Sequence, residues 1–153
     1  MTESSSQSAN VCLGTVLDRF EMTIEAGKVR EFARAVGDIG PAHYEPDPPV
    51  PLTFVATAAF WGRDAADLLT SLGLDLSRAL HGEEEFRYEL PLAAGMRLHA
   101  ETRLVEQDER DSRRGGKIRR FVLQTTYTGP TGQTVLVQRR TILETETSFG
   151  LQR

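Results

Sequence analysis

The sequence predicts an α+β fold in which a curved antiparallel β-sheet wraps around one long central helix. The first half of the chain carries apolar residues at helical spacing, interrupted by a proline-rich segment, and the second half alternates apolar and polar residues with a period of two. A length of 153 residues fits one domain. We place this domain at residues 11–147, between a disordered N-terminal tail at 1–10 and a C-terminal tail at 148–153.

The first elements follow from short apolar runs. Residues 11–24 are rich in β-branched and apolar side chains and predict one or two strands. A helix should follow, with Thr23 as a candidate cap and Gly37 just past its C-terminus. Its apolar face has the spacing i, i+3, i+4, i+7 and consists of Val29, Phe32, Ala33 and Val36.

A proline-rich segment separates this helix from the next one. Residues 38–51 contain five prolines, which fix φ and remove N–H donors, so we expect a stiff, extended segment that is neither helix nor central strand. The following stretch, TFVATAAFWGRDAADLLTSLGLDL, predicts one long helix whose first half is buried. Its apolar stripe comprises Phe54, Ala58, Trp61, Ala65, Leu68 and Leu72.

Four strands are expected after residue 80. The stretches EEFRYELPL, GMRLHAETRLVE, KIRRFVLQTTYT and QTVLVQRRTILE alternate in character and are separated by turn sequences. This pattern predicts antiparallel hairpins with one face on the core and one face in water. A single sheet also leaves an exposed edge, which favours pairing with a second subunit.

Composition excludes several classes of protein. A formal net charge of −4 argues against binding of nucleic acid, and no apolar run is long enough to span a membrane. The polar N-terminus lacks the features of a signal peptide, and Cys12 has no second cysteine to pair with. We therefore expect a cytoplasmic protein. No three ligands occur at metal spacing, so we expect no metal and no cofactor.

The stretch GDIGPAHYE contains the candidate catalytic residues. Asp38 and His43 lie five residues apart in the stiff loop, where a carboxylate and an imidazole can act together on one water. From spacing alone, Asp38 is equally an ordinary turn residue and His43 a satisfied loop side chain.

This stretch resembles the G-D-x-N-P-x-H motif of MaoC-like (R)-specific enoyl-CoA hydratases and 3-hydroxyacyl thioester dehydratases. PVPLTFVATAAFW resembles the start of the central helix of that family, and HGEEEFRYELPLAAGMRLHAETRLVE resembles its HG-x-x-EF-x-Y-x-x-PL-x-AG-x-x-L stretch. The resemblance runs from about Arg19 to Glu144. It is greatest to the N-terminal MaoC dehydratase type, which includes subunits of type II fatty-acid synthesis, and it implies a hot-dog fold.

The resemblance also implies a reaction, in which (3R)-hydroxyacyl and trans-2-enoyl thioesters of CoA or acyl carrier protein are interconverted. Asp38 and His43 match the catalytic pair. Backbone N–H groups at the start of the central helix would polarise the thioester carbonyl, and the acyl chain would lie along the helix. The implied substrate-binding residues are Thr53, Phe54, Val55, Ala58 and Trp61.

Two departures from the family keep a second interpretation open. Gly40 replaces the asparagine of the motif, and the segment from His43 to the helix is short. In this second interpretation, the chain is a non-catalytic, acyl-binding subunit beside a catalytic MaoC-like partner. The sequence is compatible with both a homodimer and a heterodimer. A hot-dog thioesterase is less favoured, because no acidic residue occurs from Pro51 to Arg63.

Three further features have two interpretations each. His81 either lies near the pocket mouth or, as we favour, makes a structural hydrogen bond, and His99 should lie on the exposed sheet face. A basic cluster could bind the phosphates of CoA or the acidic surface of a carrier protein. The alternative, which we favour, is that it is a solvated hairpin tip. The cluster comprises Arg110, Arg113, Arg114, Lys117, Arg119 and Arg120.

Overall fold

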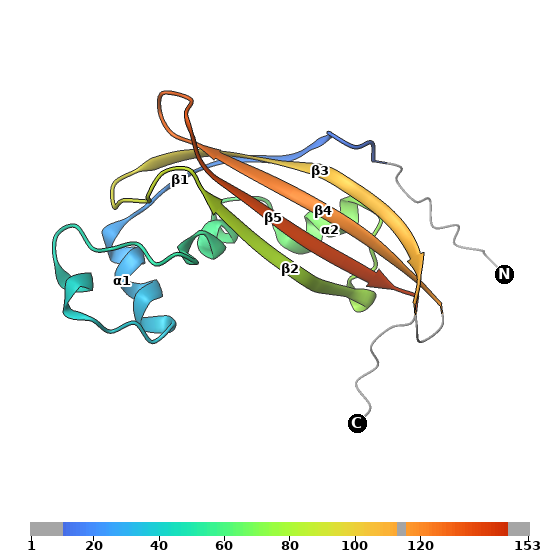
Figure 1. Cartoon of the computed structure of the whole chain (residues 1–153), viewed down its shortest axis with the longest axis horizontal. Coiled ribbons are helices and arrows are strands. Elements are labelled where there is room, and N and C mark those ends of the chain that lie inside the picture. Colours follow the sequence, from blue (N-terminus) through green and yellow to red (C-terminus); the bar gives the residue numbers. More distant parts are fainter. Residues whose placement is uncertain (1–10, 113–115, 147–153) are drawn as a thin grey trace.

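The computed structural model describes residues 11–112 and 116–146. Within them, one antiparallel sheet has the strand order β1-β3-β4-β5-β2 (Figure 1). The two predicted tails lie outside the described residues. The strands are β1 (Val16–Thr23), β2 (Ala79–Tyr88), β3 (Arg97–Asp111), β4 (Lys117–Thr128) and β5 (Thr134–Thr145). The four predicted strands of the second half are therefore confirmed, as is one strand within residues 11–24.

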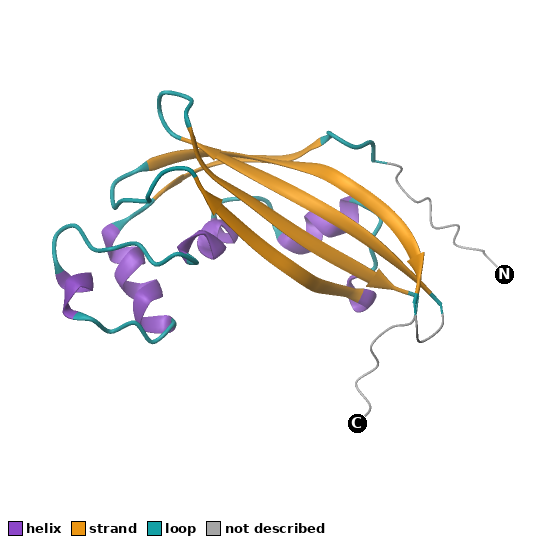
Figure 2. Ribbon diagram, viewed as in Figure 1, coloured by secondary structure: helices purple, strands orange, loops and turns teal. Residues whose placement is uncertain are grey.

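The helical elements lie on one side of the sheet, the first two beyond one of its ends and others within its curve (Figure 2). Alternation of side chains along each strand gives the sheet an apolar inner face that these helices cover. In chain order they are α1 (Ala26–Ala35), the 3₁₀ helices η1 (Pro41–Tyr44) and η2 (Phe54–Phe60), α2 (Ala65–Ser71) and the 3₁₀ turn η3 (Leu76–Arg78). This arrangement confirms the predicted α+β class.

The central helix is interrupted, so the prediction of one continuous helix is wrong. The segment consists of η2, a break at residues 61–64 and α2. A Cβ at Gly62 would lie 2.8 Å from Asp18 Oδ2, so the chain passes β1 too closely for a larger residue. The same carboxylate accepts the N–H of Arg63 at 2.7 Å, and Asp64 caps α2. Contacts with β1 therefore end one helix and a new cap starts the next.

The first helix and the loop differ from their predictions in detail. The residue that caps α1 is Glu25 rather than Thr23, and it makes no side-chain capping bond. Gly37 follows the helix with φ +82°, as expected at this position. The proline-rich segment is not wholly extended, because η1 forms where Pro41 supplies its preset φ to the first helical turn.

Two apolar clusters form the core. One joins α1 and η2 to the end of the sheet where β1 runs into α1, and includes Met22, Ile24, Val29, Phe54, Leu98 and Leu136. The other joins α2 to the opposite end of the sheet, and includes Leu68, Leu72, Leu104, Phe121, Leu123 and Ile142. Between them, the inner face of the sheet carries polar side chains. None of the helices within residues 11–112 and 116–146 has the length and apolar character needed to cross a membrane.

Candidate functional site

Local backbone hydrogen bonds position the Asp38–His43 pair. The N–H of Asp38 donates to Ala33 O at 2.8 Å, which closes the end of α1. The N–H of His43 donates to Gly40 O at 3.2 Å within the first turn of η1. With both backbones held in this way, His43 Nε2 lies 2.8 Å from Asp38 Oδ2.

The two members of the pair differ in exposure. The Asp38 side chain is 55% exposed, whereas that of His43 is 7% exposed. The hydrogen bond from His43 lowers the pKa of Asp38 below its ordinary value, so the carboxyl is ionised at neutral pH. The other ring nitrogen, His43 Nδ1, is buried without a hydrogen-bond partner. The ionised carboxylate of Asp38 is therefore accessible to solvent, and the buried ring of His43 contacts one of its oxygens.

The five residues that the sequence assigns to substrate binding lie in different surroundings. Phe54 and Val55 are fully buried in the core, and the N–H of Phe54 already donates to Pro51 O at 2.9 Å. Thr53 is exposed at the start of η2, and Trp61 packs partly buried against the first core cluster. Ala58 alone of the five lines the main cavity described below.

A largely apolar cavity of about 380 Å³, termed the main cavity because of its position under the sheet, lies between η2–α2 and the inner face of the sheet. Its helical wall consists of Arg63 and of small and aliphatic residues such as Ala59, Gly62 and Leu69. Neither Asp38 nor His43 lines it. The cavity therefore lies apart from the loop that holds Asp38 and His43. Of its lining residues, the sequence analysis had assigned only Ala58 to substrate binding.

A connected polar belt forms the sheet wall of this cavity. Tyr127 donates its O–H to Gln138 Oε1 at 2.7 Å, and Gln138 donates in turn to Glu84. Glu84 also accepts from Arg140 Nε at 3.0 Å and contacts His81 Nε2 at 2.7 Å. Burial raises the pKa of Tyr127 well above its ordinary value, so its hydroxyl keeps its proton.

A bulge in β2 places His81 and Glu84 on the same face. In a regular strand, residues three apart point to opposite faces. The register shifts between His81 and Glu83, so the extra residue, Gly82, brings both side chains to the cavity. A Cβ at Gly82 would meet Leu143 Cγ at 3.2 Å. The Gly inside a strand pattern was the sequence signal for this bulge. His81 contacts Glu84 and also lines the cavity, so both surroundings considered for it, a polar partner and the pocket, are present.

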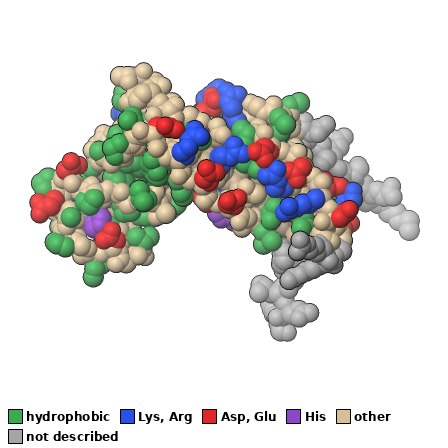
Figure 3. Space-filling model, in the orientation of Figure 1, with side chains coloured by type: hydrophobic (Ala, Val, Ile, Leu, Met, Phe, Trp, Pro, Cys, Tyr) green, Lys and Arg blue, Asp and Glu red, His purple; other side chains and the backbone are tan. Residues whose placement is uncertain are grey.

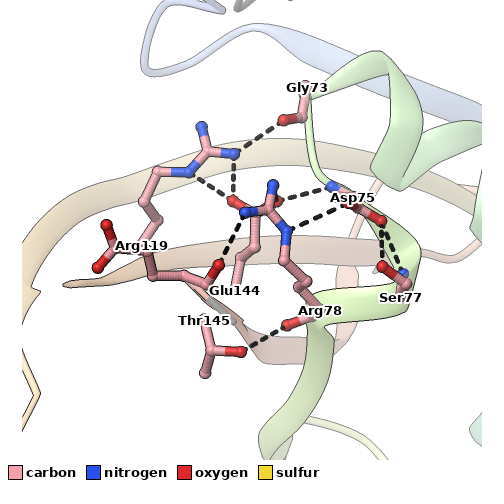
Figure 4. A network of polar contacts seen from close by, with 8 residues as sticks. Gly73, Asp75, Ser77, Arg78, Arg119, Glu144 and Thr145 are labelled. Atoms are coloured by element: carbon pink, nitrogen blue, oxygen red, sulfur yellow. Dashed lines mark hydrogen bonds and ion pairs between the residues drawn. The ribbon is translucent and has the colours of Figure 1, made fainter. Parts of the chain in front are cut away.

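A second hollow, of about 510 Å³, surrounds Glu144 near the far end of the sheet. Glu144 is buried and accepts the N–H of Asp75 at 2.7 Å, and it pairs with Arg78 and Arg119 (Figure 4). Arg119 also donates to Gly73 O at 2.8 Å. These contacts tie the turn after α2 to β4 and β5, so this network is structural.

Three described members of the basic cluster, Lys117, Arg119 and Arg120, pair with acidic groups. Lys117 pairs with Glu109, and Arg120 pairs with Glu106 and Asp108. Arg113 and Arg114 lie outside the described residues. Figure 3 shows basic and acidic side chains interspersed over the strands rather than one basic patch. His99 is exposed beside Glu21, as expected, with 3.1 Å between Nδ1 and Oε1.

Comparison with known proteins identifies relatives over most of the chain. A model described as the FAS1-like dehydratase domain region matches residues 12–138. A UPF0336 protein of Saccharopolyspora erythraea is 32% identical over 125 residues, which cover 76% of this chain and 77% of that protein. A UPF0336 protein of Streptomyces coelicolor is 41% identical over 80 residues, 46% of this chain. This match spans about half of the Streptomyces protein, 53% of its length.

A solved structure shows the same fold. It is a chain of the C-terminally truncated HadBC (3R-hydroxyacyl-ACP dehydratase) complex of Mycobacterium tuberculosis, with a TM-score of 0.64 and 21% identity. The match covers 83% of this chain and 95% of the HadBC chain. At this level of identity the likeness establishes the fold, which confirms the predicted hot-dog architecture.

Proposed function

Because the chain belongs to the FAS1-like dehydratase domain family of MaoC-like hot-dog proteins, we propose that it interconverts (3R)-hydroxyacyl and trans-2-enoyl thioesters. The thioester would be carried by CoA or by acyl carrier protein, as in the HadBC complex, whose name specifies the latter. A second hot-dog chain, identical or different, is the expected partner, because both edge strands of the sheet, β1 and β2, have an unpaired side.

The observation that carries this proposal is the contact between an exposed, ionised Asp38 and a buried His43. In hydration, the oxygen of a water bonds to C3, the water loses a proton, and C2 gains one. A carboxylate with one oxygen held by an imidazole has a second oxygen that can accept the proton of the water. The pair can then return a proton to C2, which restores its starting state.

From their exposure we infer different roles for the two residues. Asp38 is the member that water or the hydroxyl of a substrate can reach, whereas His43 orients it through the 2.8 Å contact. The charge that develops on the thioester oxygen requires a separate donor. Since the N–H of Phe54 is engaged with Pro51, the backbone groups of Thr53 and Val55 are our candidates for that donor.

Substitution of the pair tests the proposal. Asp38→Asn keeps the shape of the side chain but removes the basic carboxylate, so we expect the rate of enoyl-thioester hydration to fall at least about 100-fold. His43→Ala should lower it by a similar factor. The measurement is the loss of enoyl absorbance with crotonyl-CoA and longer trans-2-enoyl-CoAs.

Asp47→Asn is the matched control, because Asp47 lies exposed in the same proline-rich loop and makes no described contact with the pair. Its rate should equal that of the wild type. Equal turnover by wild type, Asp38→Asn and His43→Ala would remove the catalytic role of the pair.

A non-catalytic, acyl-binding subunit is the second candidate. It is favoured by one observation, namely that the pair does not line the main cavity. Under this alternative, a catalytic MaoC-like partner supplies the reactive groups. Activity that appears only in a mixed complex and survives Asp38→Asn in this chain would establish the second candidate over the first.

A further inference from the structure

The polar belt described above also includes Thr102 and Thr125, and it crosses the inner face of the sheet where a continuous apolar core would be expected. Thr125 and Gln138 face each other across β4 and β5, and both are buried. Thr102 lies next to them on β3, with 2.8 Å between its hydroxyl oxygen and that of Thr125. The belt separates the two apolar clusters and borders the 380 Å³ cavity.

The belt has hydrogen-bonding capacity beyond its internal contacts. The two threonine hydroxyls carry two protons and use one of them between themselves. The Gln138 amide donates one N–H to Glu84, and its second N–H has no described partner. The orientation of this amide follows from its neighbours, because Nε2 must face the Glu84 carboxylate. At least two donor hydrogens without a described partner therefore belong to residues that line the cavity.

An unsubstituted alkyl chain is a poor occupant of such a cavity. It would remove water from these hydroxyl and amide groups without replacing the hydrogen bonds, at a cost of about 1–3 kcal/mol for each group left unsatisfied. An oxygen substituent at the height of the belt would accept from Gln138 or a threonine, while the methylene groups on either side meet Ala58, Leu69 and Leu123.

We propose that the belt selects acyl groups that carry a hydroxyl or keto oxygen partway along the chain over unsubstituted chains of equal length. The inference rests on the proposed function, because it takes the ligand to be the acyl part of a thioester. The cavity volume is at the lower end of the range of about 300–1,000 Å³ for small-molecule sites, so it fits an acyl group rather than a whole acyl-CoA.

Binding measurements test this selection without any turnover. The probes are dodecanoyl-CoA and its isomers with a single hydroxyl at successive carbons of the distal half, titrated calorimetrically into the wild-type protein. At least one isomer should bind about tenfold more tightly than dodecanoyl-CoA, a difference of about 1.4 kcal/mol. In Gln138→Leu this preference should disappear.

Gln124→Leu is the matched control. Gln124 precedes Thr125 on β4, so its side chain points to the opposite face of the sheet, where it accepts from Arg139 at 3.3 Å. This variant should keep the wild-type preference. If Gln138→Leu does not fold, Thr125→Val removes a belt hydroxyl at constant shape and should reduce the preference.

Equal dissociation constants for substituted and plain chains in the wild type would overturn the inference and leave the proposed reaction untouched. Retention of the preference in both Gln138→Leu and Thr125→Val would also overturn it. Absence of binding both by every acyl-CoA and by the same acyl groups on acyl carrier protein would contradict the thioester ligand itself, and with it both proposals.

Discussion

Asp38 and His43 illustrate how a local sequence fixes the geometry of a side-chain pair. Gly37 ends α1 with a positive φ, and the turn of η1 then brings residue 43 back towards residue 38. All of the backbone hydrogen bonds that hold the two residues span five residues or fewer. Their 2.8 Å contact therefore requires little help from the sheet.

The contact has a consequence for pH dependence. The hydrogen bond from His43 lowers the pKa of Asp38, so the folded state holds the ionised form more strongly than the unfolded chain does. The stabilisation is present above the ordinary pKa of Asp, 3.8, and is lost as the pH falls through the lower, folded value. Carboxyl carbon shifts in an NMR titration should give a lower midpoint for Asp38 in the wild type than in His43→Gln.

Asp75 supplies the control for this titration. Hydrogen bonds from Ser77 lower its pKa, and it has no contact with His43. Its midpoint should be the same in the wild type and in His43→Gln. An unchanged midpoint for Asp38 in the variant would show that His43 does not stabilise the carboxylate.

At the scale of elements, the break between η2 and α2 shows how a tertiary contact overrides helical periodicity. The apolar stripe of residues 54–72 continues through the break, so periodicity alone predicts a single helix. The sequence did contain two signals for the break, a glycine at position 62 and an aspartate, Asp64, in a capping position. The partner that makes the break necessary, Asp18, is 44 positions away from Gly62 in sequence.

Gly62→Ala should destabilise the fold at this break. The added methyl would lie 2.8 Å from Asp18 Oδ2 and 3.0 Å from the Phe20 ring, so the segment must shift. We expect the free energy of unfolding to fall by about 1–3 kcal/mol, as for other overpacked positions. Urea denaturation gives this quantity.

The matched control is Gly27→Ala in the first turn of α1. A Cβ there meets nothing within 4 Å. This substitution should leave stability unchanged or raise it by about 0.5–1 kcal/mol, because alanine loses less entropy in a helix. If Gly62→Ala were equally harmless, close approach to β1 would not be the cause of the break.

At the scale of the whole molecule, the Glu144 network joins two layers. The buried carboxylate of Glu144 accepts from Asp75 and pairs with Arg78 and Arg119, and Arg119 also donates to Gly73 O (Figure 4). These contacts tie the turn after α2 to β4 and β5. The second apolar cluster lies in the same region. The carboxylate therefore fixes the position of the helical layer over this end of the sheet.

Glu144→Gln should lower the free energy of unfolding by about 2 kcal/mol, because it weakens hydrogen bonds from two guanidinium groups. Chemical denaturation monitored by the fluorescence of Trp61 provides the measurement. Glu109→Gln is the control, since Glu109 pairs with Lys117 at the surface and should contribute less than about 1 kcal/mol. An equal loss of unfolding free energy in the two variants would contradict the role of Glu144 in joining the two layers.

The sequence by itself determined the strands of the second half and the Asp38–His43 geometry, because both depend on alternation or on contacts between residues close in the chain. Only the tertiary structure decided the break at Gly62 and the polar belt around Gln138. Each of these joins residues from distant segments, and their contact depends on strand register, on the bulge at Gly82 and on the curvature of the sheet. A linear pattern records which face a side chain takes, but it does not record which side chains from other strands meet it there.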